Sequence, residues 1–277
     1  MLARIQSCAV LGIDAHPLAV EVDIRPGENR IKMVGLPDAA VKESEDRVGA
    51  ALRNSGFRTP RGAVVVNLAP ADMRKQGSAL DLPIALGILA ATGQLNGSRL
   101  RDHVIVGELA LDGSLRPVAG ALAMAISARN LGMRGIILPE QNAGEAGVTD
   151  RVEVIPARTL MEAHAFLSGK LEIAPHVTDV AAAFAAADTQ APDLSDVKGQ
   201  AAVKRALTVA AAGGHNLLMV GPPGTGKTML ASRLPGILPE MSFEEALETT
   251  QVYSVMPTVS RRDALMVARP FRSPHHT

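Results

Sequence analysis

Eight consecutive residues, Gly221-Pro222-Pro223-Gly224-Thr225-Gly226-Lys227-Thr228, carry the clearest chemistry in this chain. They fit the pattern G-x-x-x-x-G-K-[ST], in which glycines let backbone N–H groups turn toward a phosphate without a Cβ clash. The start of a following helix adds partial positive charge. Lys227 is expected to neutralise the β- and γ-phosphates, and Thr228 to hold Mg²⁺. The stretch therefore predicts an ATP site with Mg²⁺ as its metal.

The segments on either side of this loop predict the elements that position it. The apolar run HNLLMV, residues 215–220, predicts a strand, and TMLASRL, residues 228–234, predicts a helix. A further helix is predicted over residues 197–214. Strand, loop and helix in this order favour a phosphate-binding loop over a chance glycine-rich turn.

Hydrolysis of ATP requires one more feature, an acidic residue that positions the metal ion. It is expected at the end of another apolar strand, and no such strand is recognisable after Thr228. The acid-rich stretch FEEALETT, residues 243–250, indicates a helix instead. We therefore expect this chain to be part of a longer protein whose catalytic residues lie beyond Thr277. By itself it is expected to bind nucleotide weakly and not to hydrolyse it.

A second stretch with chemical potential is RKQGSALDLPIAL, residues 74–86, where Ser78 precedes an apolar helix. A nucleophilic serine needs a base beside it. No lysine lies between Gln76 and Gly169, so a serine–lysine pair is not expected in this region. Ser78 is predicted instead to cap the helix, with Asp81 as the acid of a capping box.

The composition limits the classes of protein to consider. A length of 277 residues suits two domains, and 47% hydrophobic residues with only 2% aromatic ones predict aliphatic cores. The 28 basic residues balance 28 acidic ones, so any nucleic-acid surface must be local. Cys8 is the only cysteine, which excludes an intramolecular disulfide and a cysteine metal site.

Location is predicted from the same composition. Polar residues interrupt the apolar N-terminal segment, which makes it a poor signal peptide. No uninterrupted apolar run reaches the roughly 20 residues of a membrane span. We therefore expect a cytoplasmic protein that does not enter a membrane.

Alternating strands and helices predict that residues 1–169 form one α/β or α+β domain. The alanine-rich stretch 170–193 is predicted to be a linker with a helical turn or more, with a surface helix of the first domain as the alternative. Residues 194–277 are predicted to be the beginning of a P-loop α/β domain. Within the first domain, a helix is expected between a cap at Asp38 and an end at Gly56. Residues 104–118 (VIVGELALDGSLRPV) predict a hairpin with an Asp-Gly turn. Further strands are expected at 3–13, 19–24, 30–36, 62–70, 135–139 and 152–157, and further helices at 78–93, 119–132, 140–147 and 159–169.

Several stretches resemble a known family. DVKGQAAVKRALTVAAAGGHNLLMVGPPGTGKTMLASRLPGILP (196–239) and RPFRSPHHT (269–277) resemble AAA+ ATPases of the magnesium-chelatase subgroup. With GLPDAAVKESEDRVGAAL (35–52), NLAPADMRKQGSALDLPIALGILAATG (67–93) and VGELALDGSLRPVAGALAMAISARNLGMRGIILPEQNAGEA (106–146), nearly the whole chain resembles the YifB/ComM family. The resemblance implies that Val197 and Gly199 lie near the adenine. It also implies a hexameric ring with ATP between subunits, and helicase activity in DNA branch migration during transformation and recombination.

The first domain also resembles the Lon protease domain, which implies a fold like domain 2 of ribosomal protein S5. In this comparison Ala79 stands at the position of the serine nucleophile and Leu122 at that of the lysine. The catalytic pair is thus absent, and we do not expect a protease. The domain is interpreted as a scaffold that contacts protein or DNA.

Two basic segments leave alternatives open. Arg53, Arg58 and Arg61 can bind phosphate or form a solvated charged face. The segment 269–277 can line a ring pore and touch DNA, or be a solvated tail; its basic residues are Arg269, Arg272, His275 and His276.

Two alternatives to a DNA motor also stay open. One is a chelatase-type ATPase that remodels a protein or inserts a metal. The other is a scaffold module in which the ATPase part only controls assembly.

Overall fold

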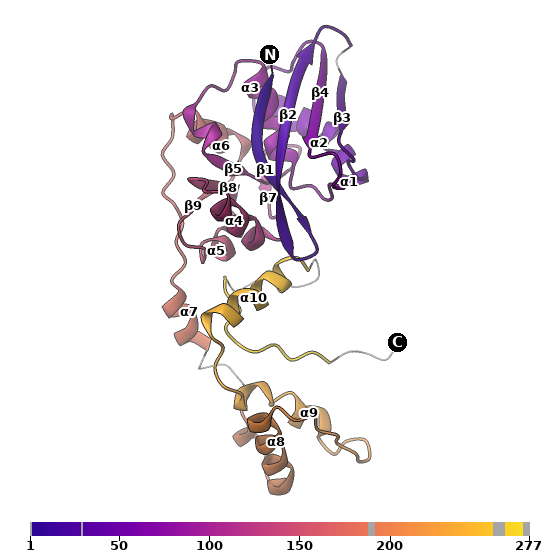
Figure 1. Cartoon of the computed structure of the whole chain (residues 1–277), viewed down its shortest axis with the longest axis vertical. Helices are drawn as coiled ribbons and strands as arrows, with labels where there is room; N and C mark the ends of the chain where they lie inside the picture. Colours follow the sequence, from indigo (N-terminus) through magenta and orange to yellow (C-terminus); the bar gives the residue numbers. More distant parts are fainter. Residues whose placement is uncertain (1, 29, 188–191, 257–263, 274–277) are drawn as a thin grey trace. The chain divides into compact units, whose positions relative to one another are not determined.

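The computed structural model describes residues 2–28, 30–187, 192–256 and 264–273 and has an α/β fold (Figure 1). It divides into two compact units, which we describe separately. Unit 1 consists of Met1–Thr178 and Thr250–Ala264, and unit 2 of Asp179–Thr249 and Leu265–Thr277. The predicted division into residues 1–169, 170–193 and 194–277 stays a prediction.

A four-stranded sheet forms one half of unit 1, with strand order β1-β2-β4-β3. Strands β1 (Ala3–Leu11), β2 (Asp14–Arg25) and β4 (Ala63–Ala69) are antiparallel neighbours, while β3 (Arg30–Val34) runs parallel to β4 at the edge. Alternate residues of β4 are buried, because successive side chains of a strand point to opposite faces. Their partners in β2 are buried or half-buried apolar residues too, as in the pair Val22 and Val66, so one face of the sheet lies on the core.

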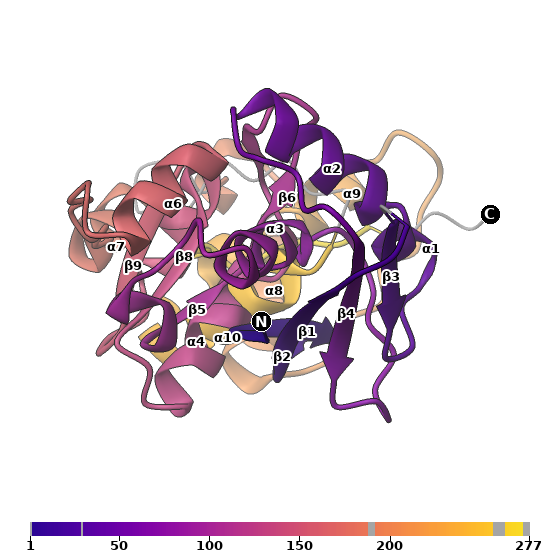
Figure 2. The same ribbon diagram turned by 90° about the horizontal axis from the view of Figure 1, so that it is seen from above.

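Helix α3 (Asp81–Ala91) packs against β1 and β2 with α2 (Ser44–Asn54) beside it (Figure 2). Every residue of α3 is buried, as expected for a helix whose residues after Asp81 are apolar all round. The helix lies close to the sheet at Gly87, where an added Cβ would meet Val22 Cγ2 at 2.6 Å. Glycine is therefore required there for the helix to reach the sheet.

The predicted helix between Asp38 and Gly56 is confirmed, but it is broken into α1 (Ala39–Lys42) and α2. The Asp38 carboxylate accepts a hydrogen bond from Val41 N at 2.8 Å, so this cap is confirmed. Gly56 follows α2 with φ of +77°, a backbone conformation that glycine adopts without strain.

The second half of unit 1 contains a parallel sheet with strand order β5-β8-β9. Its strands are β5 (His103–Ile105), β8 (Gly135–Pro139) and β9 (Glu153–Ala157), joined through α4 (Ala121–Asn130) and α5 (Ala143–Ala146) and followed by α6 (Leu160–Leu167). The predicted hairpin is also confirmed: β6 (Glu108–Leu109) pairs with β7 (Leu115–Arg116), and Gly113 in its turn has φ of +87°.

Unit 2 is helical in its described residues. It contains α7 (Val180–Ala187), α8 (Ala201–Gly213), α9 (Lys227–Ala231) and most of α10 (Phe243–Ser254). Helix α8 lies within the predicted range 197–214, and α10 covers the acid-rich stretch predicted to be helical. A small core gathers Leu194, Val197, Leu207 and Leu230.

The predicted strand over residues 215–220 is wrong for the described structure, in which this segment is neither helix nor strand. Leu218 is 87% exposed and Val220 88% exposed. A strand satisfies its backbone groups only by pairing with another strand. All strands that the structure describes lie between Ala3 and Ala157, in unit 1, so this apolar segment has no described strand of its own unit to pair with.

Candidate functional site

The glycine-rich loop of unit 2 joins the apolar segment 215–220 to α9. Gly224 and Gly226 have φ of +83° and +81°, in the left-handed region that other residues rarely adopt. Gly226 is also the N-cap of α9, so the loop enters the helix directly. These two glycines give the backbone the turn that a phosphate cradle requires.

The side chain of Lys227 folds back over this loop. Its Nζ donates hydrogen bonds to the carbonyl oxygens of Gly221 and Pro222, at 2.7 and 2.8 Å. Thr225 Oγ1 also donates to Pro222 O, at 2.9 Å. The loop is thus closed around an ammonium group that a phosphate oxygen can bind in place of these carbonyls.

The other residues that were predicted to bind ATP differ in their exposure to solvent. Thr228 is exposed, and its hydroxyl makes no hydrogen bond within the part of the chain that the structure describes. Val197 is buried in the same cluster as Leu230 of α9, whereas Gly199 is exposed. The fold therefore brings Val197 toward the helix that follows the loop. This donor set of hydroxyl, ammonium and turned backbone fits a magnesium–triphosphate group.

Two contacts near Val197 were not anticipated from the sequence. Lys204 Nζ donates to Val197 O, and Arg233 lies 3.7 Å from Asp196 in an ion pair. Both contacts join segments apart in sequence, which local pattern analysis does not detect.

The basic residues predicted in the C-terminal segment 269–277 do not share one environment. Arg269 is engaged internally: it donates to Pro239 O at 2.8 Å and bonds Glu245 at 2.8 Å. This arginine thus holds the start of α10 in unit 2. Arg272 is exposed, and His275 and His276 lie outside the described residues.

The region around Ser78 corrects a sequence prediction. Ser78 does not cap α3: Leu80 is the N-cap, without a side-chain hydrogen bond. The Ser78 hydroxyl instead donates to the carboxylate of Glu108, in β6. The predicted capping box is therefore wrong, because both of its side chains have stronger partners far away in the sequence.

Asp81 is the centre of a buried polar network. Its side chain is fully buried and accepts hydrogen bonds from Arg47 Nε at 2.7 Å and Arg47 Nη2 at 3.0 Å. Ser44 Oγ and the backbone N–H of Leu109, the latter at 3.2 Å, donate to the same carboxylate. Both oxygens are thus used for holding α2, α3 and β6 together.

The residues aligned with the Lon catalytic pair are apolar, one half-buried (Ala79) and one fully buried (Leu122). Leu122 is fully buried in α4, and the carbonyl of Ala79 accepts from Gly107 N at 2.8 Å. Lys75, near these residues in the chain, is fully buried and donates through Nζ to Pro70 O. Desolvation lowers the pKa of its ammonium group.

The last features to consider are a buried histidine, clusters of possible metal ligands and helices that could span a membrane. His103 is buried, with Nδ1 at 2.9 Å from Arg99 O. In the described ranges, no group of three or more His, Cys, Asp or Glu side chains is placed to hold a metal ion. Nor do the residues that the structure describes include a helix with the length and apolar character needed to cross a membrane.

Comparison with protein families gives two matches. Residues 20–142 match the model described as subunit ChlI of Mg-chelatase, and residues 193–277 match the model described as magnesium chelatase, subunit ChlI. The first match lies in unit 1, and the second contains the P-loop.

Comparison with individual proteins agrees with these matches. The chain is 48% identical over 279 residues to the uncharacterized protein YifB of Salmonella typhimurium, covering 100% of this chain and 53% of that protein. It is 46% identical over 279 residues to the competence protein ComM of Haemophilus influenzae, covering 100% and 54%. A Lon protease of Lachnoclostridium phytofermentans is 23% identical over 158 residues, 52% of this chain and 19% of that protein. The chain thus spans about half the length of the YifB and ComM relatives.

Proposed function

Because this chain belongs to the YifB/ComM family of magnesium-chelatase-like proteins, we propose that it carries the ATP-binding part of a DNA-acting motor. In this proposal the whole protein is a cytoplasmic AAA+ ATPase that assembles as a hexameric ring. It uses ATP to drive branch migration or strand separation during transformation and recombination. The name of the competence protein ComM supports a role of this kind.

The observation that carries the proposal is the loop around Lys227. Its ammonium bonds two carbonyls of its own loop, at 2.7 and 2.8 Å, and two left-handed glycines turn the backbone beside it. ATP with Mg²⁺ supplies a phosphoanhydride whose hydrolysis releases free energy. Lys227 binds phosphate oxygens, Thr228 offers a hydroxyl to the metal, and the backbone of Gly221–Gly226 surrounds the charge.

The remaining assignments of the nucleotide site are part of the same proposal. Pro222, Pro223 and Thr225 shape the loop, while Val197 and Gly199 lie on the adenine side. The acidic, sensor and arginine-finger residues of hydrolysis belong to the part of the longer relatives that this chain does not span. We propose no catalytic residue within this chain.

Unit 1 has no protease activity in this proposal. A Lon-type serine nucleophile needs a lysine base beside it, and Ala79 and Leu122 stand at the two positions of that pair. Leu122 offers no proton-accepting group. Unit 1 acts instead as a binding scaffold.

The test uses the full-length protein with a three-strand DNA junction and ATP. Wild type is expected to move the branch point, and Lys227→Ala to bind ATP about 100-fold or more weakly and to lose the movement, because charge-assisted phosphate contacts are lost. Equal branch-migration rates in the two proteins would contradict the proposal.

A chelatase-type or protein-remodelling ATPase is the second candidate, favoured by the ChlI description of both family models. It retains the nucleotide site but has no need of DNA. DNA affinity across salt concentrations separates the two candidates, since a protein that grips phosphates weakens steeply as salt rises.

A further inference from the structure

Residues 94–101 of unit 1, which we call the latch, connect α3 to β5 and are held on the end of α6. His164 Nε2 of α6 lies 2.9 Å from the carbonyl oxygen of Gln94. Arg99 Nη1 donates to Phe166 O at 3.1 Å, and the guanidinium carbon of Arg99 lies 4.7 Å from the centre of the Phe166 ring. The latch thus ties the start of β5 to a helix that is distant in the sequence.

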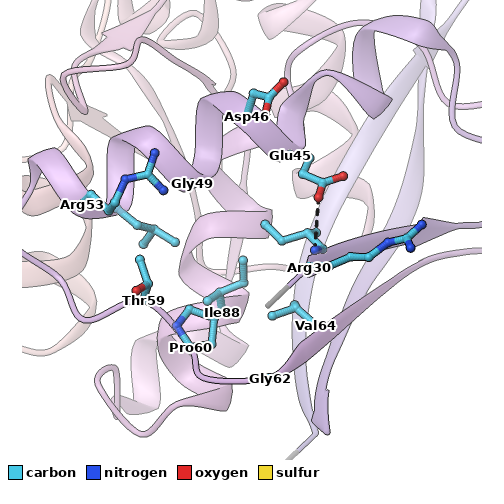
Figure 3. A pocket seen from close by; sticks show the side chains of 12 residues that line it. Arg30, Glu45, Asp46, Gly49, Arg53, Thr59, Pro60, Gly62, Val64 and Ile88 are labelled. Atoms are coloured by element: carbon cyan, nitrogen blue, oxygen red, sulfur yellow. Dashed lines mark hydrogen bonds between the residues drawn. The ribbon is translucent and has the colours of Figure 1, made fainter. Parts of the chain in front are cut away.

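Gln94, at the start of the latch, also holds a loop of the same unit. Its Nε2 donates to Arg58 O at 2.8 Å, and its Oε1 accepts from Arg58 N at 3.0 Å. Thr59 and Pro60 follow Arg58 and line a pocket of about 310 Å³ (Figure 3). The charged residues that line this pocket are two arginines and two acids, so its lining has no net charge that selects an ion. Its relevance here is that the latch fixes one of its walls.

His103, the first residue of β5, fixes the other end of the latch. Its Nδ1 lies 2.9 Å from Arg99 O, and because a carbonyl oxygen can only accept, Nδ1 carries the proton and donates. The side chain is fully buried, and its ring meets the Phe166 ring edge-on at a centroid distance of 5.5 Å. The neutral ring therefore has its lone pair on the other nitrogen, Nε2.

This second nitrogen, Nε2, is enclosed and has no hydrogen-bond partner among the residues that the structure describes. It lies beside Gly135 of β8, the register partner of His103, where an added Cβ would be 3.1 Å from Nε2. Gly135 leaves room for the ring but has no side chain that can accept a proton. A proton on Nε2 would thus be a buried donor without an acceptor, which is costly.

The charged groups around His103 do not supply the missing acceptor. They come from the latch and the residue after it, from the loop before β8 and from β9, and they are Arg99, Asp102, Arg134 and Glu153. The Glu153 carboxylate is paired with Arg134 at 3.2 Å. From α6, the uncharged ring of Phe166 packs on His103. Desolvation in this enclosure lowers the pKa of the His103 imidazole.

We propose that the latch is a pH-sensitive switch of unit 1, released from α6 when His103 takes up a proton at mildly acid pH. The new N–H finds no acceptor in the enclosure, so the ring leaves it and withdraws its hydrogen bond from Arg99 O. Arg99 and Phe166 then separate, and the loop at Arg58 loses the segment that held it. At neutral pH the ring stays uncharged and the latch stays closed.

The direction of the pH effect follows from the two states of the latch. Because burial lowers the pKa of His103 in the closed state below its ordinary value of 6.5, the open state binds the proton more readily. The closed state is fully favoured above about pH 6.5. Below it, the equilibrium constant for opening rises up to about tenfold for each pH unit, until the pH reaches the lowered pKa of the closed state.

The test measures hydrogen exchange of the backbone amides of residues 94–105 in the 277-residue chain, one pH unit above and one below 6.5. Wild type is compared with His103→Asn, whose amide group keeps a donor for Arg99 O but does not titrate. Since the intrinsic exchange rates of the two proteins are nearly equal at a given pH, the ratio of their exchange rates compares their opening. The matched control is His16→Asn, at an exposed histidine of β2.

Between the higher and the lower pH, the ratio of exchange rates of wild type to His103→Asn is expected to rise about five- to tenfold. The control is expected to follow wild type. A second measurement needs no variant: after correction for intrinsic rates, wild type should lose protection in the latch at the lower pH, while the paired amides of β2 and β4 keep theirs. This measurement decides by itself if His103→Asn does not fold.

Two results would overturn the proposal. One is an equal pH response of wild type and His103→Asn, which shows that another group titrates. The other is a loss of protection in wild type that extends equally to β2 and β4, because it indicates acid unfolding of the whole of unit 1. Neither measurement involves ATP or DNA, so its outcome is independent of the proposed motor function.

Discussion

In unit 1 the carboxylate of Asp81 is fully buried and bonded on both oxygens, whereas in unit 2 the ammonium of Lys227 bonds acceptors of its own exposed loop, two carbonyls and the Thr225 hydroxyl. The first arrangement connects three elements of one core. The second connects nothing beyond the loop and leaves the charge within reach of a ligand. A buried charged side chain thus holds elements of the fold together in unit 1. In unit 2 the charged side chain can exchange its hydrogen-bond partners for those of a ligand.

The apolar residues differ in the same way. Unit 1 buries an entire helix, α3, whereas unit 2 exposes Leu218 and Val220 almost completely. Burial of apolar surface is the main stabilising contribution in folding. We therefore expect substitutions in unit 1 to act on stability, and substitutions around the P-loop to act on binding.

The largest expected effect is that of Asp81→Ala. Removal of this carboxylate leaves the Arg47 guanidinium without its main partner in a largely buried position, which costs about 3–5 kcal/mol of unfolding free energy. Urea denaturation of the 277-residue chain measures it. The control, Asp150→Ala, removes two exposed ion pairs, with Arg129 and Arg151, and is expected to change little. Similar midpoints for wild type and Asp81→Ala would refute the structural role of this network.

A pair of leucine substitutions compares the two cores directly. Leu89→Ala removes a fully buried side chain of α3 and is expected to destabilise unit 1 by about 2–5 kcal/mol. Leu218→Ala, at a residue that is 87% exposed, is expected to change stability by less than about 0.5 kcal/mol. Thermal unfolding followed by circular dichroism measures both. A large loss for Leu218→Ala would show that segment 215–220 is packed in solution.

The lowered pKa of Lys75 predicts that the stability of unit 1 depends on pH. Desolvation lowers the pKa of its ammonium group in the folded protein below the ordinary value of 10.5, so the unfolded chain binds the proton more readily. Stability then rises with pH up to about 10.5, by about 1.4 kcal/mol for each pH unit of the shift. Urea titrations between neutral and alkaline pH, compared with Lys75→Met, isolate this contribution. Lys170→Met, an exposed control, is expected to keep the wild-type slope.

The smallest expected effect on stability is that of Lys227→Ala. Because its contacts are confined to an exposed loop, the unfolding free energy should change by less than about 0.5 kcal/mol. Isothermal titration with ATP and Mg²⁺ should nevertheless show a large loss of affinity in the full-length protein. A loss of stability comparable to that of Asp81→Ala would show that the contacts of Lys227 stabilise the fold, as those of Asp81 do, and would contradict the comparison of the two units.

Local chemistry explains which parts of the structure were predictable from the sequence. The Asp38 cap and the Asp-Gly hairpin depend on residues close together in the chain, and both were predicted. Ser78 and Asp81 were misassigned because their partners, Glu108 and Arg47, lie 30 and 34 positions away. The strand over 215–220 was predicted from apolar character alone, although a strand also needs a neighbour. The P-loop pattern located the candidate site, but its internal lysine contacts were visible only in the structure.

The carbonyl oxygens of Gly221 and Pro222 accept hydrogen bonds from Lys227 Nζ, so they compete with a phosphate for this ammonium group. Any phosphate must displace carbonyl oxygens that already solvate the ammonium, so the measured affinity reports a difference between two sets of acceptors. In the proposed nucleotide site, phosphate binding is therefore the substitution of one set of oxygen acceptors by another around Lys227 Nζ.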